Sequence, residues 1–444
     1  MSYSIAEHIT ILFRADLLGI VFALFFAFIF ILVGIAAKEY MEHEGGVKRF
    51  YVCFFLTILM LMLLCFAGNF FTCYLFFEAM TFVSMPMVMH SGTHESVMAA
   101  LKYLFYSVGG AFLTLFGFFL FISKGYDLSF AAGGSTGVEP LSGMELFAAF
   151  LMILGFGTKA GMFPMHGWLP TAHPVAPSPA SAVLSGVITK AGVFGIVRCI
   201  YFVIGCDRLK GTWVQTAFLI LSLITVFMGS MMAYQEKVLK KRLAYSTVSQ
   251  VSYVLFGLAL MNRTAFLGAI LHVFFHSLVK DMLFLSAGAI IMKSGYTGVP
   301  DLSGIGRKMP VTMWCFTLCS ITLIGIPPTS AFMSKWYLGA GSLESGIPII
   351  RWLGPAILLI SALLTAGYLL TVSLDAFFGK EKSGDEKVCD KDRADKEGSA
   401  PGIADPGFLY RLSMIILTVL SVALGIFPAY LSGIIESIAD AVIR

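Results

Sequence analysis

Apolar runs of about 20 residues recur along almost the whole chain of 444 residues. A helix of that length spans the hydrocarbon core of a bilayer. Within a bilayer, only helices and closed barrels satisfy every backbone polar group. Hydrophobic residues make up 58% of the chain and charged residues only 13%, whereas a soluble domain averages about 25% charged residues. The sequence therefore predicts an all-α integral membrane protein.

We predict about 12 transmembrane helices. Their expected ranges are 12–37, 50–67, 70–90, 98–123, 144–164, 178–204, 213–234, 242–260, 264–292, 310–342, 351–378 and 408–432. The segment 379–407 carries mixed charges without apolar periodicity, so we expect a solvated loop there. The N-terminal residues lack the basic region and the small-residue cleavage site of a secretory signal, so we expect them to lead into a retained first span.

Cations concentrate in two of the short connections, KVLKKR (237–242) and GRKMP (306–310), whereas the connections that alternate with them carry at most two cations. Cytoplasmic loops of membrane proteins carry an excess of lysine and arginine. We therefore predict a multi-pass protein of the cell (cytoplasmic) membrane with its N-terminus outside. Both cationic connections and the charged loop 379–407 would then be cytoplasmic.

The sequence contains no pattern typical of a redox cofactor. No two of its eight cysteines form a CxxC pair, and an iron–sulfur cluster needs a run of cysteines. The glycines of GFGTKAG (155–161) lie inside an expected span, not at a strand-to-helix turn that would hold a dinucleotide. We expect no cofactor, no metal and no redox site in this chain, so any enzymatic activity would belong to a larger assembly.

Four lysines, Lys159, Lys190, Lys280 and Lys335, lie far from the ends of the expected spans. A charged side chain at the centre of a bilayer costs a few kcal/mol or more. Lys102 lies near a span end, from which a long side chain can reach water. Packing alone does not account for four lysines in the middle of spans, so these residues indicate a polar site.

Glu78 lies among apolar and aromatic residues in NFFTCYLFFEAMTFVSMPMVM (69–89). An isolated carboxyl there would be protonated because burial disfavours its charged form, whereas an opposing lysine would keep it charged. Lys159 is the natural candidate for that lysine, and an isolated protonated glutamate is the alternative. Lys190 is surrounded by small residues, among them Gly186 and Gly192, which let helices or water approach closely.

His272, His276 and Lys280 follow one another at intervals of four residues. That spacing places them on one face of a helix, over about 12 Å of its axis. Titratable groups stacked in this way within a membrane are typical of a proton relay. The alternative is that each histidine is an ordinary packing residue with satisfied hydrogen bonds.

Prolines interrupt two of the spans that carry lysines. Pro164 follows Lys159, and Pro327 and Pro328 precede Lys335. A proline breaks the backbone ladder of a helix, and broken backbone and water provide the polar partners that a buried lysine needs. Broken helices at corresponding positions of two halves indicate inverted repeats with a path at the bilayer midplane. A lysine removed from water in such a place can take up and release a proton near neutral pH.

The segment GTKAGMFPMHGWLPTAHPVAPSPASAVLSGVITKAGVFG (157–195) closely resembles the signature of the antiporter-like membrane subunits. These are the large proton-translocating subunits of NADH:quinone oxidoreductase (respiratory complex I), of the group 4 membrane-bound hydrogenases and of the Mrp cation/proton antiporters. Three further segments resemble the family in the same order: KKRLAYSTVSQVSYVLFGLAL (240–260), HVFFHSLVKDMLFLSAG (272–288) and GIPPTSAFMSKW (325–336). The resemblance extends over residues 50–378.

This resemblance implies two inverted five-helix repeats, each with a broken helix, at 50–204 and 213–378. A peripheral N-terminal helix in 1–49, the cytoplasmic charged loop 379–407 and a peripheral C-terminal helix in 408–444 would complete the chain. Family members often have about 14 helices, so we expect this chain to lack two peripheral helices at its N-terminal end.

The resemblance also implies roles for the buried charges. Glu78 and Lys159 match the family's paired glutamate and lysine, Lys190 the bridging lysine, His272, His276 and Lys280 the central relay, and Lys335 the terminal residue of the broken helix. Such subunits hold no electron carriers. The implied partners are a second antiporter-like subunit, small helical membrane subunits, a peripheral redox arm and the lipid bilayer, and nucleic acid is not among them.

Three positions depart from the family pattern. Thr171 replaces a usual acidic residue at a helix entrance, and Asp375 falls where a neutral or basic residue is expected. Asp281 stands beside Lys280 in place of a small or apolar residue, about 100° around the helix. We expect that Asp281 can hold Lys280 in its charged form and so alter the relay.

The sequence thus predicts a proton-translocating subunit of an energy-converting redox complex, of the NADH:quinone oxidoreductase or group 4 hydrogenase type. Protons would pass from Lys159 to Lys190, then to His272, His276 and Lys280, and finally to Lys335, while Glu78 switches the charge of Lys159. Two alternatives stay open. One is an Mrp-type Na⁺/H⁺ antiporter subunit without redox chemistry, which the motifs do not distinguish. The other is a structural membrane subunit whose charges no longer conduct.

Overall fold

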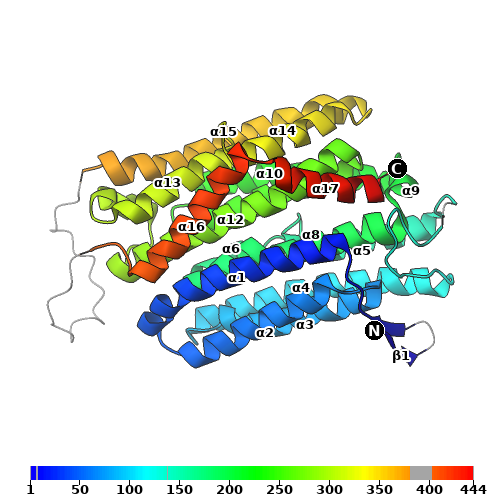
Figure 1. Cartoon of the computed structure of the whole chain (residues 1–444), viewed down its shortest axis with the longest axis horizontal. Coiled ribbons are helices and arrows are strands. Elements are labelled where there is room, and N and C mark those ends of the chain that lie inside the picture. Colours follow the sequence, from blue (N-terminus) through cyan, green and yellow to red (C-terminus); the bar gives the residue numbers. More distant parts are fainter. Residues whose placement is uncertain (1, 7–8, 138, 381–402, 444) are drawn as a thin grey trace.

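The computed structural model describes residues 2–6, 9–137, 139–380 and 403–443. Long helices lie side by side along the longest axis of the molecule (Figure 1). Within the described residues, 11 helices are long and apolar enough to cross a membrane. The predicted all-α membrane fold is confirmed.

The first half of the chain forms one short hairpin and six of these long helices. The elements are β1 (Ser2–Ala6), β2 (Ile9–Leu12), α1 (Leu17–Glu44), α2 (Val47–Cys65), α3 (Phe70–Val88), α4 (His94–Ser123), α5 (Gly143–Ala160), α6 (Leu169–Val175), α7 (Ser178–Val183), η1 (Leu184–Ile188), α8 (Thr189–Val197), η2 (Arg198–Ile204) and α9 (Cys206–Leu209). The elements α7, η1, α8 and η2 are consecutive parts of one long helix, Ser178–Ile204, in which η1 and η2 are π-helical turns.

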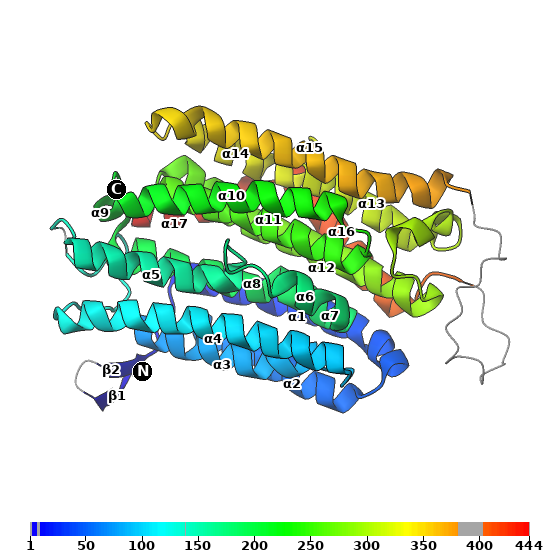
Figure 2. The same ribbon diagram turned by 180° about the vertical axis from the view of Figure 1, so that it is seen from behind.

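The second half contains five of the long helices and several shorter ones. The elements are α10 (Trp213–Gln235), α11 (Leu239–Leu260), α12 (Arg263–Ser294), the 3₁₀ turns η3 (Val299–Leu302) and η4 (Ile305–Arg307), α13 (Pro310–Ile324), α14 (Ser330–Leu343), α15 (Pro348–Phe378), α16 (Phe408–Ile426) and α17 (Ala429–Val442). From behind, α4 and α5 form one adjacent pair and α10 and α11 another (Figure 2).

The tenth predicted span, 310–342, is divided between two helices. α13 has 15 residues and α14 has 14, and each is too short to count among the 11 apolar spans. Gly325 ends α13 with a backbone φ of 90°, and Pro327 and Pro328 lie between the two helices. The expected break is therefore present, and it accounts for the difference between 12 predicted spans and 11 long helices.

The N-terminal segment differs from the expected start of a span at residue 12. β1 and β2 form an antiparallel hairpin, and the side-chain amide of Asn69 donates to the carbonyl of Thr10 at 2.7 Å. The first helix begins at Leu17, after Asp16, whose carboxylate accepts a hydrogen bond from the Gly19 amide at 2.8 Å. An aspartate cap of this kind sets a helix start, so the polar cap and not the apolar run decides where the span begins.

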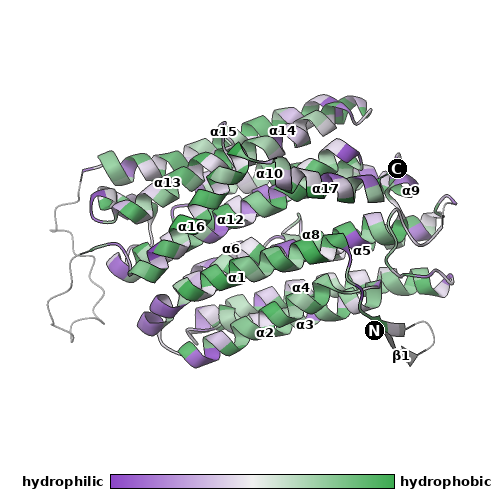
Figure 3. Cartoon of the chain, in the orientation of Figure 1, coloured by the Kyte–Doolittle hydropathy of each residue, from purple (hydrophilic) through white to green (hydrophobic). Residues whose placement is uncertain are grey.

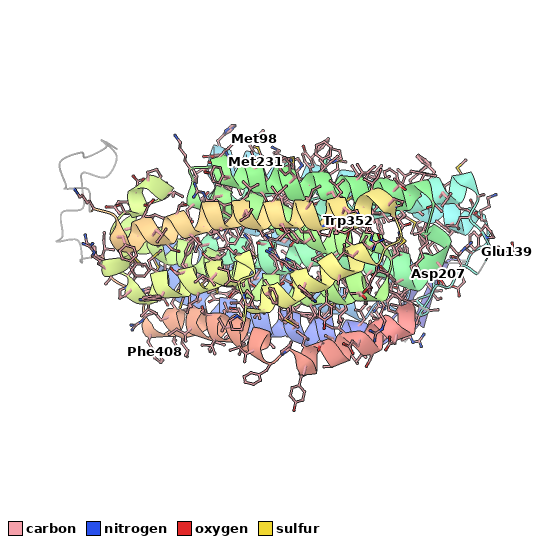
Figure 4. The ribbon with its side chains drawn as sticks, turned by 90° about the horizontal axis from the view of Figure 1, so that it is seen from above. Met98, Glu139, Asp207, Met231, Trp352 and Phe408 are labelled. Carbon is pink, nitrogen blue, oxygen red and sulfur yellow. The ribbon has the colours of Figure 1, made fainter. Side chains whose placement is uncertain are left out.

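The centre of the bundle is formed by α11, α12 and the helix Ser178–Ile204. The most apolar part of α12 is 94% buried, against 28% for α2. Helices that are apolar on all sides lie in a protein core or face lipid. Hydrophobic residues cover the long helices, and hydrophilic ones gather near the helix ends (Figure 3). The exposed side chains of Met98 and Phe408 lie at the periphery (Figure 4).

The two cationic connections lie together at one end of the bundle. Val238 and Gly298 form a backbone bridge, and the amide of Gly304 donates to the carbonyl of Asp375 at 3.0 Å, where α15 ends. The N-terminus lies at the opposite end (Figure 1). This arrangement agrees with the predicted topology, although most of the charged loop, residues 381–402, lies outside the described part of the chain. Which end faces the cytoplasm stays a prediction.

Glycines allow α4 and α5 to pack with their backbones close together. A Cβ atom added at Gly155 would lie 2.1 Å from the Thr114 hydroxyl oxygen and 2.3 Å from the Gly110 carbonyl oxygen. Small residues at helix interfaces permit such close approach in membrane proteins, where association depends on van der Waals packing.

We expect Gly155→Ala to lower the Tm of the purified protein in detergent, because the helices must separate to admit the methyl group. Overpacking of this kind costs about 1–3 kcal/mol. The matched control is Gly109→Ala on α4, where an added Cβ meets no atom within 4 Å. That variant should keep or slightly raise the Tm, since alanine favours a helix over glycine. Equal Tm values for the two variants would contradict the close packing of α4 and α5.

Candidate functional site

Lys159 lies in the last turn of α5, just before the first break in the bundle. Gly161 ends the helix with a backbone φ of 80°, and helix resumes only at Leu169. Pro164 falls between them, as the sequence predicts. The lysine side chain is fully buried, and a cation near a helix C-terminus is favoured by the helix dipole.

The amine of Lys159 reaches across to α3. It donates a hydrogen bond to the Thr81 hydroxyl and approaches the Phe77 carbonyl oxygen at 3.4 Å. It also lies over the rings of Phe77 and Tyr103, 4.5 and 5.8 Å from their centroids, where a cation is attracted by the aromatic face. The direct partners of Lys159 are therefore a hydroxyl, a carbonyl and two rings.

Glu78 lies on α3, half-buried, next to the residue whose carbonyl faces Lys159. Its Oε1 atom is buried without a hydrogen-bond partner. Among the described residues, the ion pairs within 4.0 Å do not include Glu78. Lys159 nevertheless contacts the same stretch of α3, at Phe77 directly before Glu78 and at Thr81 one turn after Phe77. The structure thus places the predicted pair near each other without direct contact.

Lys190 joins α8 to α12. Its amine donates to the Ser185 carbonyl at 2.5 Å and hydrogen bonds with Nδ1 of His276 at 2.8 Å. A lysine ammonium can only donate, so Nδ1 accepts when Lys190 is charged. The predicted bridging lysine and the predicted relay helix are brought into direct contact.

The two histidines of α12 connect three helices. The rings of His272 and His276 stack with centroids 5.9 Å apart and planes at 18°. Nδ1 of His272 hydrogen bonds with the Ser334 hydroxyl on α14 at 2.9 Å, and Nε2 with the Gln250 side-chain oxygen on α11 at 3.2 Å. Nε2 of His276 is buried without a partner. Both rings are fully buried.

Lys280 departs from the row expected on α12. It is fully buried, and its amine donates to the Leu243 carbonyl on α11 at 3.0 Å. No hydrogen bond between Lys280 and either histidine is present in the described part of the chain. The three residues share one helix as predicted, but the long lysine side chain turns towards α11.

Lys335 binds the end of the preceding broken helix. Its amine donates to the carbonyls of Leu323 and Ile324 at 2.7 and 2.9 Å, which belong to the last turn of α13. Such carbonyls have no partner within their helix and carry the negative end of its dipole. The amine also lies 5.0 Å from the centroid of the Tyr253 ring. The break therefore supplies the polar partners of this lysine.

These contacts connect Lys190 to Lys335 without interruption, since the Tyr253 ring in turn stacks on His272 at 5.5 Å. We call this set the central row, and its members are Lys190, His276, His272, Ser334, Tyr253 and Lys335. Lys159 lies on the neighbouring helix. This helix, α5, packs closely on α8, because a Cβ atom added at Gly192 of α8 would lie 2.6 Å from the carbonyl oxygen of Phe156 on α5.

The structure shows what surrounds Thr171 and Asp281, two of the residues that depart from the family pattern. The Thr171 hydroxyl accepts a hydrogen bond from the Lys102 amine at 3.0 Å, so a neutral group occupies the position where an acid was expected. Asp281 is fully buried, and neither carboxyl oxygen has a hydrogen-bond partner. Both oxygens lie against Gly186, on the helix that carries Lys190, whereas the Lys280 amine binds the Leu243 carbonyl.

Several polar partners were not anticipated from the sequence: Thr81, Ser185, Gln250, Tyr253 and Ser334. Single hydroxyls and amides occur in many membrane helices, so they give little signal. Gln250 and Ser334 do lie inside the segments that resemble the family, which could have singled them out. Among the described residues, no three His, Cys, Asp or Glu side chains group as metal ligands would.

Arg198 is a further buried charge outside the central row. The Arg198 guanidinium binds both carboxylate oxygens of Asp16, at 2.5 and 2.8 Å, and is itself fully buried. It also lies over the rings of Phe130, Phe194 and Phe202, 4.5–4.9 Å from their centroids. This pair ties the start of α1 to η2, and the sequence did not predict it.

The central row lies within a segment that matches a known protein family. A family described as "NADH:quinone oxidoreductase/Mrp antiporter, TM" matches residues 67–365. The chain is 36% identical over 359 residues to NADH-quinone oxidoreductase subunit N of Desulforudis audaxviator, covering 78% of this chain and 69% of that protein. It is 29% identical over 375 residues to a Na(+)/H(+) antiporter subunit of Alkalihalophilus pseudofirmus, covering 84% of this chain and 72% of that protein.

The fold is also similar to that of a chain in the Mrp complex from Dietzia sp. The TM-score is 0.85 at 23% sequence identity, and the match covers 100% of this chain and 87% of that chain. At this level of identity the likeness concerns the fold.

Removing the Asp16 charge leaves the buried Arg198 without a counter-charge. We expect Asp16→Asn to destabilise the protein by about 3 kcal/mol, the lower end of the range for broken buried pairs, because the Asp16 side chain is 27% exposed. Thermal unfolding in detergent measures the effect. Asp440→Asn is the matched control, because Asp440 pairs with Arg263 at the surface, where ion pairs contribute little. A Tm loss as small as that of the control would show that Arg198 does not depend on Asp16.

Proposed function

Because this chain belongs to the NADH:quinone oxidoreductase/Mrp antiporter family of membrane subunits, we propose that it moves protons across the membrane within a larger energy-converting complex. The observation that carries the proposal is the central row, an unbroken set of contacts from Lys190 to Lys335 inside an apolar bundle. Buried titratable groups in membrane helices are expensive and mark ion pathways.

Protons pass from Lys159 to Lys190, then to the two histidines, and then to Lys335. The contact of Lys190 with His276 supports the central step, because an imidazole accepts a proton at one nitrogen and releases one from the other. Lys280 lies one helical turn beyond His276, and because its amine binds the Leu243 carbonyl, we place it beside the path and not between the histidines and Lys335. The amines of Lys159 and Lys190 bind other groups, and we propose that water carries the proton between them.

Glu78 controls the charge of Lys159 by pairing with it and separating from it. A carboxylate close to a lysine favours the charged amine. The arrangement in which Lys159 binds Thr81 corresponds to the separated state. When the lysine turns to Glu78, it takes up a proton, and when it returns to Thr81, it releases the proton towards Lys190.

We further propose two five-helix repeats, at 50–204 and 213–378. The order of helices supports this division. In the first segment, the fourth helix is α5, which ends at the break before α6, and in the second the fourth helix is α13, which ends at the break before α14. Each break thus lies at the same place in its repeat and adjoins one lysine, Lys159 or Lys335.

The complex that we propose is of the NADH:quinone oxidoreductase or group 4 hydrogenase type. The identity of 36% to a NADH-quinone oxidoreductase subunit N supports it. Electron transfer then belongs to a peripheral redox arm, and a second antiporter-like subunit and small helical subunits complete the membrane part. The second candidate is an Mrp-type Na⁺/H⁺ antiporter, which the likeness to a Na(+)/H(+) antiporter subunit favours.

Isolation of the tagged chain from its own membranes in mild detergent separates the two candidates. Iron and flavin in stoichiometric amounts would support the redox complex, and nickel would mark the hydrogenase type. An eluate with small membrane proteins but without a redox centre would favour the antiporter. Sodium-dependent proton flux in vesicles without any electron donor would then confirm that function.

We expect Lys159→Ala and Lys335→Ala to lower proton transport by about tenfold or more, since each removes one protonatable group from a serial path. Proton uptake by inverted membrane vesicles measures the rate, and the yield of assembled complex is measured beside it. The control is Lys237→Ala, which removes an exposed lysine between α10 and α11. Wild-type transport by Lys159→Ala in a fully assembled complex would refute the path.

A further inference from the structure

Asp281 is a buried acid that the path proposed above does not use. It lies on α12, fully buried, and neither carboxyl oxygen has a hydrogen-bond partner. An unpaired polar group in an apolar interior is costly, and a carboxylate more so than a neutral group. An apolar side chain would pack better at this position.

The surroundings of Asp281 place its carboxyl against the helix that carries Lys190. A Cβ atom added at Gly186 would lie 2.2 Å from each carboxyl oxygen, so the missing side chain of this glycine makes the space that the carboxyl fills. Gly186 lies in the π-helical turn η1, four residues before Lys190. Residues four apart lie on one face of a helix. The carboxyl therefore lies on the Lys190 side of this helix.

The position of α12 against η1 is fixed by a second contact. The Ser277 hydroxyl, one turn before Asp281, donates to the Gly186 carbonyl at 2.6 Å. This hydrogen bond holds the two helices close together, so that the Asp281 carboxyl fits against Gly186.

The charges around the carboxyl make Lys190 its natural partner. Lys190 acts on Asp281 electrostatically, and Asp281 on Lys190. The neighbouring Lys280 turns away to the Leu243 carbonyl. Lys190 also hydrogen bonds with His276, the next member of the central row. Lys190 thus lies near both an acid and a base.

We propose that Asp281 and Lys190 form a second carboxyl–lysine pair, in which the carboxyl of Asp281 carries a proton in alternation with the amine of Lys190. This inference rests on the proposed function and adds a site to it. The step moves one proton from the Lys190 ammonium to the Asp281 carboxylate and leaves an amine and a carboxylic acid. No other reactant takes part, and the pair has zero net charge before and after the transfer.

The pair gives the path a way to hold a proton deep in the bundle. Without Asp281, a proton on Lys190 leaves a net positive charge next to His276 and near Lys280, in a region of low dielectric constant where like charges repel strongly. With the carboxylate present, the same proton leaves the pair neutral. A second proton arriving at the pair then makes it cationic and drives the first onward to His276.

The test compares Asp281→Asn, Lys190→Ala and the double variant in the whole assembled complex, with proton uptake by inverted vesicles as the measurement. We expect Asp281→Asn to transport protons about tenfold more slowly or worse, because an adjacent opposite charge changes the protonation equilibrium of a lysine by about that factor. The double variant should be no slower than the slower single variant, because the two residues act as one unit. Asp375→Asn, the same change at an exposed aspartate, is the control and should transport normally.

A second readout responds to protonation and not to structure. In the infrared difference spectrum between two pH values, the carbonyl stretch of a protonated carboxyl should be missing in Asp281→Asn and shifted in Lys190→Ala. This comparison also decides the case if Asp281→Asn does not assemble, because wild type and Lys190→Ala suffice for it. An identical carboxyl spectrum in these two proteins would overturn the pair.

The outcomes separate this inference from the proposed function. Normal transport by Asp281→Asn, together with blocked transport in Lys159→Ala and Lys190→Ala, overturns the pair and leaves the path intact. Normal transport by both lysine variants overturns the path and the pair together. Slow transport by Asp281→Asn with additive loss in the double variant shows that Asp281 acts apart from Lys190, and this also overturns the pair.

Discussion

A lysine amine inside an apolar bundle must have polar partners, and the rest of this structure depends on that constraint. The chain meets it in a different way at each position. Lys159 has a hydroxyl and two aromatic rings, Lys190 has a carbonyl and an imidazole, and Lys335 has the last carbonyls of a broken helix. Each solution requires a neighbouring helix at a fixed place. The buried charges therefore set the arrangement of the helices as much as the apolar packing does.

The same contacts that make burial tolerable also connect Lys190 with Lys335. α12 is the point where they converge, because α8, α11 and α14 each reach its histidines through one polar side chain. A core of hydrocarbon side chains would pack around α12 equally well. What it could not provide is a set of titratable and polar groups in contact with one another, which the proposed proton path requires.

Much of this arrangement follows from the sequence, and the remainder has an identifiable cause. Apolar length predicts the spans, proline predicts both breaks, and the four-residue spacing places His272, His276 and Lys280 on one helix. Periodicity fixes the face of a helix but not the end of a long, flexible side chain. For that reason the sequence did not predict that the Lys280 amine binds a carbonyl of α11 or that the Lys159 amine binds Thr81. The start of α1 at Leu17 depends on a polar cap, which the apolar run conceals.

The tie between Arg198 and Asp16 has a consequence for how the chain is made. The two residues are 182 positions apart, so the first transmembrane helix is synthesised long before its anchor leaves the ribosome. Asp16 therefore cannot meet this partner until the helix Ser178–Ile204 has been made. We expect the tie between the start of α1 and η2 to form late in biogenesis, after that helix has been inserted.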